Sequence, residues 1–291
     1  MAYSNLIAAH LDHRRSYNDF HYIYPVISRR SEGLSIGVNL NPDRRCNFNC
    51  IYCEVDRAGP ARHRDVDIDM LTHELRQMVR IYQDGALFAR EPFAGAPPKW
   101  RELKDISFSG DGEPTTCPVF EQAVQAVWHV REVLGLKTTK LVLITNAACL
   151  DRPGVRRGIL RMLTGEHEIW AKLDAGTPEY YRAVNRSRIP YANILRNIIE
   201  TAIWCPLVIQ SLFLRVCGEP PADAEIRAYA SRLNKIRVQG GQILSLQLYT
   251  IARPATAIWA TPLSDEELNR IAAMVKEMTG LPNHLFYGDV A

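Results

Sequence analysis

Short apolar segments alternate with segments of helical periodicity from residue 34 onward. The apolar segments are rich in branched residues and are bounded by Gly, Pro, Asn or Asp, which is typical of strands. They are Leu34–Leu40, Lys104–Ser109, Leu141–Thr145, Glu168–Leu173, Leu207–Leu214 and Ile243–Tyr249. The helical patterns cover Met70–Tyr82, Val119–Leu134, Gly154–Leu163, Tyr191–Trp204, Ala222–Val238 and Asp265–Thr279. This alternation predicts an α/β fold in which six parallel strands are joined by helical crossovers.

The same pattern predicts how the chain is organised. Residues 1–33 lack the alternation and are interpreted as an N-terminal extension, and residues 34–291 as one domain. The segment Gly85–Pro98, rich in Ala, Gly and Pro, is interpreted as an insertion before the second strand. Ser264 and Glu267 form the sequence pattern of a capping box, which predicts the start of the last helix.

Polar residues share one face of the predicted strands, because alternate side chains of a strand point to opposite faces. On four strands this face carries Ser35, Gly37, Asn39, Ser107, Ser109, Trp170, Lys172, Asp174, Ser245, Gln247 and Tyr249, most of which are polar. A closed eight-stranded barrel has an apolar interior, and a doubly wound sheet has two apolar faces. The pattern therefore favours an open barrel around a polar cavity. A helix-backed sheet with one solvent-facing side remains an alternative.

Composition narrows the class of protein only a little. A hydrophobic content of 47%, a charged content of 23% and a net charge of +3 are those of an ordinary globular protein. The segment Met1–His10 is short and interrupted, so we expect no secretion signal, and no run is long enough to span a membrane. Seven cysteines at irregular spacing argue against a disulfide scaffold. We therefore expect a cytoplasmic protein without a membrane partner.

Three cysteines, Cys46, Cys50 and Cys53, carry the strongest chemical signal, with the spacing C-x3-C-x2-C. Three thiolates this close can converge on one soft metal centre, but structural zinc and ordinary iron–sulfur clusters use four protein ligands. The motif therefore indicates a centre with one open coordination position. An incomplete zinc knuckle or three unrelated core thiols are the alternatives. The other cysteines are scattered, and no second cluster is expected.

This motif, placed after a strand near the N-terminal third, resembles that of the radical S-adenosylmethionine (radical SAM) enzymes. The resemblance implies a partial (βα)6 barrel with six parallel strands and a [4Fe–4S] cluster on Cys46, Cys50 and Cys53. It also implies that S-adenosylmethionine binds the fourth iron and is cleaved to a 5′-deoxyadenosyl radical. Reduced flavodoxin or ferredoxin is then the expected electron donor.

The turn after the second strand resembles the family's G-G-E-P motif, which meets the amino group of S-adenosylmethionine. This chain has Gly110, Asp111, Gly112 and Glu113 there, so Asp111 is inserted into the pattern. Ligands of open α/β sheets bind beyond the carboxyl ends of the strands, where this turn lies. We interpret all four residues as cofactor-binding, and an ordinary β-turn is the alternative.

Five further residues are predicted to bind the cofactor. Asn146 ends the third strand, where the family has T-N-G, and Tyr52 stands where the family has an aromatic residue beside the adenine; its alternative role is packing. Lys172 and Asp174 lie on the polar face of the fourth strand and could meet the ribose or the carboxylate of the cofactor, or simply pair with each other. Gln210 on the fifth strand is a weaker candidate.

Four further stretches, Lys172–Glu179, Val184–Arg186, Leu248–Pro254 and Pro262–Leu268, resemble the Fe–S oxidoreductases related to wybutosine-synthesising tRNA enzymes. Those enzymes carry additional N-terminal cysteines for a second cluster, whereas residues 1–45 of this chain contain none. A tRNA-base-modifying enzyme and a non-catalytic Fe–S or zinc protein are the alternative functions. The substrate, whether a small molecule, a peptide or RNA, is not indicated by the sequence.

Overall fold

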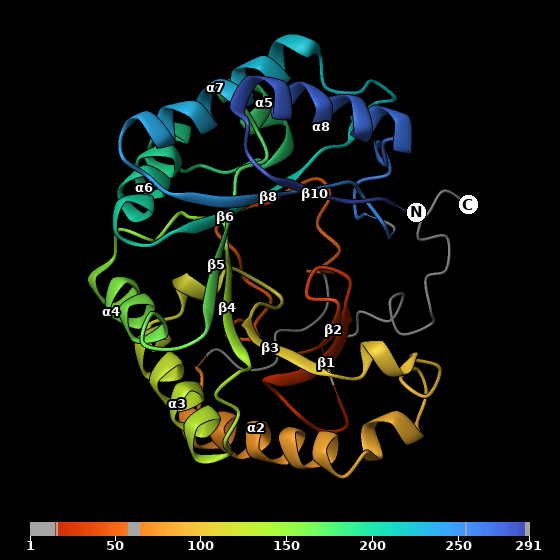
Figure 1. Cartoon of the computed structure of the whole chain (residues 1–291), viewed down its shortest axis with the longest axis vertical. Helices are drawn as coiled ribbons and strands as arrows, with labels where there is room; N and C mark the ends of the chain where they lie inside the picture. The colour runs from red at the N-terminus through yellow and green to blue at the C-terminus, as the bar shows by residue number, and fades with distance from the viewer. Residues whose placement is uncertain (1–14, 16, 58–64, 254, 289–291) are drawn as a thin grey trace. The chain divides into compact units, whose positions relative to one another are not determined.

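The structure is a computed structural model that describes residues 15, 17–57, 65–253 and 255–288. Its chain divides into two compact units (Figure 1). Unit 1 consists of Met1–Cys46, Arg57–Ile144 and Arg152–Glu168. Unit 2 consists of Asn47–Asp56, Thr145–Asp151 and Ile169–Ala291. Residues 1–14 and 16 of the predicted N-terminal extension lie outside the described residues, and the predicted domain boundary at residue 34 stays a prediction.

Unit 1 is built around strands hydrogen-bonded in the order β1-β2-β3-β4. They are β1 (Ile23–Ser28), β2 (Gly33–Val38), β3 (Leu103–Phe108) and β4 (Lys140–Thr145). Strand β1 runs antiparallel to β2, whereas β2, β3 and β4 are parallel. Ile36 pairs with Ile106, and Ile106 pairs with Leu141, so apolar side chains line up across the strands.

Helices cover the apolar side of the unit 1 strands (Figure 1). They are α2 (Ile68–Gln83), α3 (Phe120–Val133) and α4 (Pro153–Met162). Helix α2 begins at Asp67, whose carboxylate accepts two backbone N–H groups, and it buries Leu71, Leu75 and Met78 along one stripe. Helix α3 contacts both α2 and α4. Three short 3-10 turns, η1 (Ala86–Ala89), η2 (Pro98–Trp100) and η3 (Pro114–Thr116), complete the described secondary structure of this unit.

Unit 2 contains parallel strands in the order β5-β6-β8-β10. They are β5 (His167–Lys172), β6 (Leu207–Leu212), β8 (Ile243–Tyr249) and β10 (Asn283–Phe286), and the first two residues of β5 belong to unit 1. A separate antiparallel pair joins β7 (Arg215–Val216) to β9 (Ala260–Thr261). The helices are α5 (Pro178–Val184), α6 (Tyr191–Trp204), α7 (Asp223–Val238) and α8 (Asp265–Thr279). The predicted capping box of Ser264 and Glu267 is confirmed at the start of α8.

The α/β class and the six predicted strands are confirmed, but the prediction of a six-stranded sheet was wrong. The two units contain four strands each in this arrangement, eight in total, and β1 is antiparallel to its neighbour. Two of the strands that were not predicted, β1 and β10, are the outermost in strand order. Pro25 interrupts the strand signal of β1, and β10 is only four residues long, so edge strands escaped the pattern.

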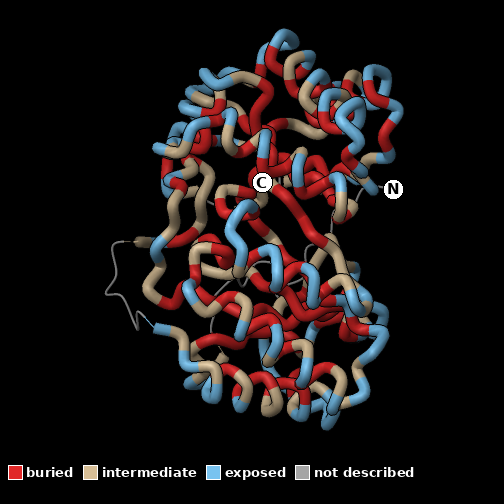
Figure 2. The backbone as a smooth tube through the Cα atoms, turned by 90° about the vertical axis from the view of Figure 1, so that its left-hand side faces the viewer, coloured by how far each residue is buried: buried red, intermediate tan, exposed pale blue. Residues whose placement is uncertain are grey.

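The polar residues on the strand faces are buried along with the apolar ones. Ser35, Ser107, Gln210 and Gln247 are each at most 6% exposed. Figure 2 shows the buried residues concentrated inside each unit and the exposed ones on outer turns and loops. This burial does not fit the alternative of a sheet with one side open to solvent. Within the described residues, no helix is long and apolar enough to cross a membrane.

Candidate functional site

The cysteine loop, defined as residues 46–53, is divided between the two units. Cys46 ends a segment of unit 1, whereas Cys50 and Cys53 belong to unit 2. The Cys53 amide donates to the Cys50 carbonyl at 3.1 Å, so these two thiols come from one tight turn. All three cysteines are of intermediate exposure. Reactive thiols lie in partly exposed positions of this kind, whereas buried structural thiols are inert.

The segment after α5 holds the cysteine loop from one side. The amide of Asn49 donates to the carbonyl of Asn185 at 3.2 Å, and the amide of Ile51 donates to the carbonyl of Val184 at 2.9 Å. These bonds fix the backbone on both sides of Cys50. Two backbone hydrogen bonds therefore anchor the loop, although it has no regular secondary structure.

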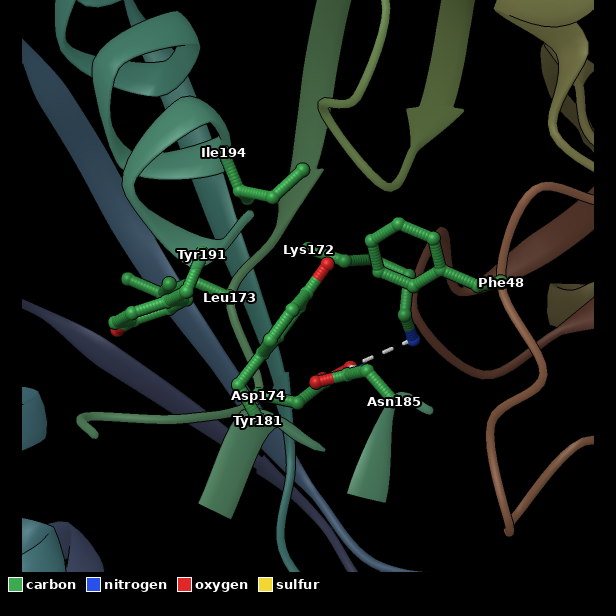
Figure 3. Close-up of a pocket in the computed structure, with 8 residues that line it drawn as sticks. All are labelled: Phe48, Lys172, Leu173, Asp174, Tyr181, Asn185, Tyr191 and Ile194. Carbon is green, nitrogen blue, oxygen red and sulfur yellow. Dashed lines mark hydrogen bonds and ion pairs between the residues drawn. The ribbon is translucent and has the colours of Figure 1, made fainter. Parts of the chain in front are cut away.

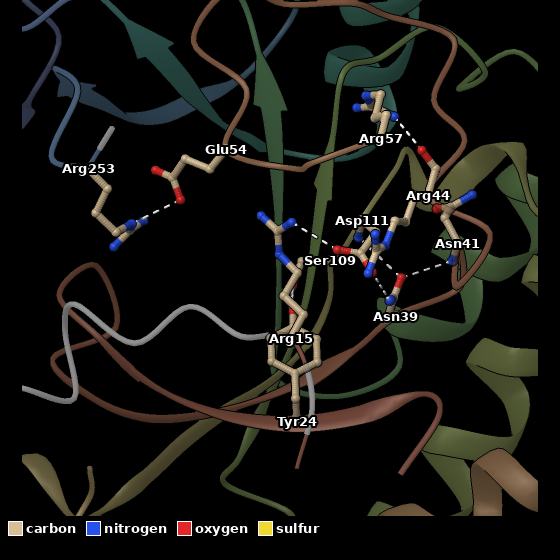
Figure 4. Close-up of polar contacts among 10 residues, drawn as sticks. All are labelled: Arg15, Tyr24, Asn39, Asn41, Arg44, Glu54, Arg57, Ser109, Asp111 and Arg253. Carbon is tan, nitrogen blue, oxygen red and sulfur yellow. Dashed lines mark hydrogen bonds and ion pairs between the residues drawn. The ribbon is translucent and has the colours of Figure 1, made fainter. Parts of the chain in front are cut away.

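The segment after β8 holds the other end of the loop. The amide of Thr256 donates to the carbonyl of Cys53 at 3.2 Å. The guanidinium of Arg253 pairs with the carboxylate of Glu54 at 2.9 Å (Figure 4). Two segments far apart in the sequence therefore fix the turn that carries Cys50 and Cys53.

Asp174 is the centre of a buried polar network in unit 2. Its side chain is 1% exposed. It accepts a hydrogen bond from Nδ2 of Asn185 at 2.8 Å (Figure 3). It also accepts from the Leu212 amide at 2.9 Å and from the Tyr52 hydroxyl. Because both carboxylate oxygens are satisfied in this way, Asp174 can remain charged in the interior.

Lys172 brings a positive charge to the same network. Its Nζ donates to the Tyr249 hydroxyl at 2.6 Å and lies 3.9 Å from the carboxylate of Asp174. It also lies 4.9 Å from the ring centroid of Tyr52 and 5.3 Å from that of Tyr249. Burial disfavours the ammonium, but the Asp174 carboxylate and the Tyr249 hydroxyl outweigh it, so the pKa of Lys172 is raised above its usual value. Lys172 is therefore a permanent cation, and the alternative that it pairs with Asp174 is confirmed.

Cys50 is the thiol that this network surrounds. Nδ2 of Asn185 lies 3.6 Å from Cys50 Sγ and donates to it. Burial raises the pKa of the Cys50 thiol to about 12, and the Asp174 carboxylate adds to the rise, while Lys172, Asn185 and Tyr52 oppose it. A thiol loses its proton when it binds a metal, so a positive metal centre would replace that proton here.

A small cavity of unit 2 lies beside this network. Its volume is about 10 Å³, which is room for about one water molecule. Its lining residues are Phe48, Lys172, Leu173, Asp174, Tyr181, Asn185, Tyr191 and Ile194 (Figure 3). The cavity joins the loop residue Phe48 to the charged pair and to Asn185, so these groups face one common space.

Asn146 is tied to the cysteine loop as well, whereas Gln210 is not. Nδ2 of Asn146 donates to Oδ1 of Asn47 at 2.7 Å. The next residue, Ala147, has a φ of 65°, a left-handed conformation that glycine adopts at lower energy, and it stands where the family motif has glycine. The Gln210 side chain donates to Gln247 at 2.7 Å within the strand face.

In unit 1, Asp111 belongs to a polar cluster at the carboxyl end of β3. Its carboxylate accepts from Nδ2 of Asn39 at 2.8 Å and pairs with Arg15 at 3.1 Å (Figure 4). Its amide donates back to Oδ1 of Asn39 at 3.2 Å. Asn39 was not predicted as a site residue, although it lies on the polar face of the first predicted strand and thus carried a signal.

The two glycines and the glutamate of this turn have identifiable structural roles. A Cβ on Gly110 would lie 2.4 Å from Oδ1 of Asn39, and a Cβ on Gly112 would lie 2.1 Å from the carbonyl oxygen of Arg45. The Glu113 carboxylate accepts from the amide of Thr115 at 3.2 Å and from its hydroxyl at 2.5 Å. Gly112 therefore lets the turn pack on the residue directly before Cys46.

The other four cysteines lie outside the cysteine loop and differ in burial. Cys117, Cys149 and Cys205 are buried and Cys217 is exposed. Among the described residues, no three His, Cys, Asp or Glu side chains lie together as a set that could hold a metal ion.

The structure brings Cys50, Tyr52, Lys172 and Asp174 together in unit 2, and Gly110, Asp111, Gly112 and Glu113 in unit 1. Asn185 was missed, although it lies in the Val184-Asn185-Arg186 stretch that carries part of the resemblance.

Comparisons with known proteins identify the fold. No protein-family model matches the chain. A UPF0026 protein of Helicobacter pylori is 25% identical over 249 residues, which cover 84% of this chain and 70% of that protein. A solved structure of TYW1 with a lysine-pyruvate adduct bound has a TM-score of 0.56 at 15% identity and covers 86% of this chain and 74% of its own. A structure of Streptococcus suis SuiB bound to S-adenosylmethionine has a TM-score of 0.56 at 11% identity, with coverage of 89% and 51%. Both structures are of radical SAM proteins, so the chain has the fold of that class, as its sequence resemblance indicated.

The residues present fit an iron–sulfur centre in their chemistry. Thiolates are the ligands that such clusters use, and the loop supplies three of them on one eight-residue segment. The Asn185 amide donates a hydrogen bond to Cys50 Sγ, and hydrogen bonds to the sulfur ligands adjust the reduction potential of such clusters. The Lys172 ammonium places a positive charge near the same sulfur, as a negatively charged thiolate centre requires.

Proposed function

We propose that this chain is a radical SAM enzyme that holds a [4Fe–4S] cluster on Cys46, Cys50 and Cys53. When bound, the cluster supplies the electron that cleaves S-adenosylmethionine to a 5′-deoxyadenosyl radical, which abstracts hydrogen from a substrate. The observation that carries this proposal is the placement of Cys50 against the Asn185, Asp174 and Lys172 network. The fold of the neighbours and the cysteine spacing support it.

The chain's own residues would bind and orient the cofactor rather than exchange protons with it. Lys172 offers a permanent cation for a carboxylate, and Asp174 offers an acceptor for an amine or for hydroxyls. Tyr52 contacts both residues, through its ring and its hydroxyl. The full proposed binding set is Tyr52, Gly110, Asp111, Gly112, Glu113, Asn146, Lys172, Asp174 and Gln210.

The direct test is anaerobic reconstitution with iron and sulfide, followed by dithionite and S-adenosylmethionine. We expect about four irons per chain and formation of 5′-deoxyadenosine. Cys53→Ala should abolish 5′-deoxyadenosine, because a lost ligand removes the site for the cluster. Cys217→Ala is the matched control, since Cys217 is an exposed thiol outside the loop, and it should behave like the wild type.

Three outcomes would overturn the proposal. Zinc bound by the three cysteines in place of a cluster would indicate a structural metal site. A complete [4Fe–4S] cluster without any 5′-deoxyadenosine would indicate a non-catalytic iron–sulfur protein. Equal product from Cys53→Ala and from Cys217→Ala would show that the loop is not involved.

The electron donor and the substrate are part of the same proposal. Reduced flavodoxin or ferredoxin is the proposed donor, and it should replace dithionite in the assay. The substrate is proposed to be a small molecule, a peptide or RNA. Salt-dependent retention of tRNA by the protein would favour the tRNA-modifying alternative, because phosphate contacts weaken as salt rises.

A further inference from the structure

Asn185, the residue that ends helix α5, lies at the point where the cysteine loop meets the charged network. It is 3% exposed. Its carbonyl accepts the amide of Asn49 at 3.2 Å, so its backbone is fixed against the loop. Its side chain then reaches back to the loop at Cys50. Both the main chain and the side chain of one residue therefore contact the segment that carries the predicted metal ligands.

The orientation of the Asn185 amide is determined by its neighbours. Nδ2 lies 2.8 Å from the Asp174 carboxylate (Figure 3), and it lies 3.6 Å from Cys50 Sγ. An ionised carboxylate only accepts hydrogen bonds, so the nitrogen and not the oxygen of the amide must face it. The nitrogen carries two N–H groups, and one serves Asp174 while the other is directed at the sulfur.

Asp174 is in turn a rigid support for this amide. The Leu212 amide and the Tyr52 hydroxyl hold its two oxygens from other directions. Lys172 places a positive charge 3.9 Å away. Asn185 therefore has little freedom to turn away from Cys50, and its second N–H stays available to the sulfur.

We propose that Asn185 is a positioning residue that donates a hydrogen bond to the Cys50 thiolate and thereby raises the reduction potential of the bound cluster. This inference rests on the proposed function, because it requires the cluster on Cys50. Reduction adds one electron from the donor to the cluster and makes its sulfurs more negative. A donor at the sulfur stabilises the reduced form more than the oxidised one, and so does the Lys172 cation, whereas the Asp174 carboxylate opposes it.

The test is a redox titration of the reconstituted protein, followed by the electron paramagnetic resonance signal of the reduced cluster. Asn185→Leu keeps the volume but removes the donor. A hydrogen bond to a charged group is worth about 1.5 kcal/mol, so we expect about tenfold less reduced cluster at a fixed potential. That ratio corresponds to a midpoint about 59 mV more negative for a one-electron couple. Asp174→Asn should shift the midpoint in the opposite direction, because it removes a negative charge and keeps an acceptor for Asn185.

Asn283→Leu is the matched control, because Asn283 donates its side-chain amide to the Ala272 carbonyl outside the cysteine loop. It should leave the potential unchanged. A cluster-loaded Asn185→Leu protein with the wild-type potential would overturn the inference, and so would shifts of the same sign from Asn185→Leu and Asp174→Asn. A purely structural residue would change the iron content and leave the potential of the remaining clusters unchanged.

A second measurement covers the case in which Asn185→Leu does not hold a cluster. Wild-type protein labelled with ¹⁵N in the side-chain amide of asparagine should show a nitrogen coupling to the reduced cluster by pulsed electron paramagnetic resonance. Absence of that coupling overturns the inference. Failure of the proposed function is distinguishable, because then no [4Fe–4S] signal or no 5′-deoxyadenosine appears in the wild type itself.

Discussion

Two buried carboxyl groups, Asp174 in unit 2 and Asp105 in unit 1, are held in contrasting surroundings. Asp174 accepts from an amide, an asparagine and a tyrosine, and lies beside the Lys172 ammonium. Asp105 is 2% exposed, and its Oδ1 accepts the Ser35 hydroxyl at 2.5 Å. Its Oδ2 is buried without a hydrogen-bond partner among the described residues. Burial raises the pKa of Asp105 to about 6, although the hydroxyls of Ser31 and Ser35 oppose the rise.

These surroundings suit two different roles. Those of Asp174 suit the binding of a charged group, whereas those of Asp105 serve the packing of the fold. The Asp174 network joins a permanent cation to a candidate metal ligand, so it can act on a charged group that binds there. Asp105 instead begins a chain of hydroxyls along the strand face. Ser35 bonds Ser107 at 3.1 Å, Ser107 bonds Ser109 at 3.2 Å, and Ser109 bonds Tyr24 at 3.0 Å. A buried carboxyl alone therefore does not mark a functional site; the charges around it do.

The strongest way to test this contrast is to remove the cation from the Asp174 network. Lys172→Met should lower the free energy of unfolding by about 3 kcal/mol, because it leaves a buried carboxylate without its positive partner. Urea denaturation of the cluster-free protein, followed by circular dichroism, measures this loss.

Two further variants make this measurement specific. The double variant Lys172→Met/Asp174→Asn should recover most of the stability, since no charge is then left uncompensated. Lys104→Met is the matched control, because Lys104 pairs with the exposed Glu102 and should contribute at most about 0.5 kcal/mol. Equal losses from Lys172→Met and Lys104→Met would contradict the assignment of a buried charge pair.

The second test uses pH on Asp105. Its pKa is raised from 3.8 to about 6 in the folded chain, so the folded state binds the proton more tightly than the unfolded one. The stabilisation from the neutral acid is thus fully present below pH 4 and is lost as pH rises through 6, by about 3 kcal/mol in total. Asp105→Asn should remove this loss, which urea denaturation at pH 4 and pH 8 measures as a difference from the wild type.

Glu179→Gln is the control for this pH series, since Glu179 is 73% exposed. Its pH dependence should equal that of the wild type. If Asp105→Asn has the same pH dependence of stability as the wild type, ionisation of Asp105 does not lower the free energy of unfolding.

Much of this organisation was predictable from residue patterns. The alternation on the strands predicted the polar strand face, and the spacing of the three cysteines singled out the cysteine loop, whose cluster stays a prediction. The pairing of Lys172 with Asp174 was predictable, because a charge on the inner face of a strand costs free energy without a partner. The edge strands β1 and β10 were missed because proline and shortness weakened their pattern.

The residues that were not predicted depend on contacts that form only in the folded chain, and a residue pattern does not show such contacts. Asn185 ends a seven-residue helix, and only the fold places its amide at Cys50 Sγ. Asp105 was not singled out because one acid in a strand does not show whether its neighbours are cations or hydroxyls. The cofactor-binding role of Gly112 stays a prediction, and only the fold shows that a Cβ there would lie 2.1 Å from the carbonyl oxygen of Arg45.

A third test asks whether the unit 1 turn supports the cysteine loop through packing. Gly112→Ala places a methyl group against the Arg45 carbonyl and should cost about 1–3 kcal/mol. Arg45 directly precedes Cys46, so iron content after reconstitution should fall as well. Gly95→Ala is the matched control, because its Cβ would meet nothing within 4 Å. Full stability and full iron content in Gly112→Ala would show that the turn is not a support for Cys46.

The smallest expected effect distinguishes the two roles of Glu113. Glu113→Ala removes the acceptor that caps η3 and should lower the unfolding free energy by about 1 kcal/mol. Glu113→Gln keeps an oxygen acceptor for Thr115, so its stability should equal that of the wild type. If Glu113 also binds the amino group of S-adenosylmethionine, as the resemblance implies, Glu113→Gln should still weaken binding of S-adenosylmethionine to the reconstituted protein, because a charged acceptor is roughly twice as strong as a neutral one. Calorimetric titration with S-adenosylmethionine measures this difference. If Glu113→Gln binds S-adenosylmethionine as tightly as the wild type does, Glu113 has only a structural role, as Asp105 has.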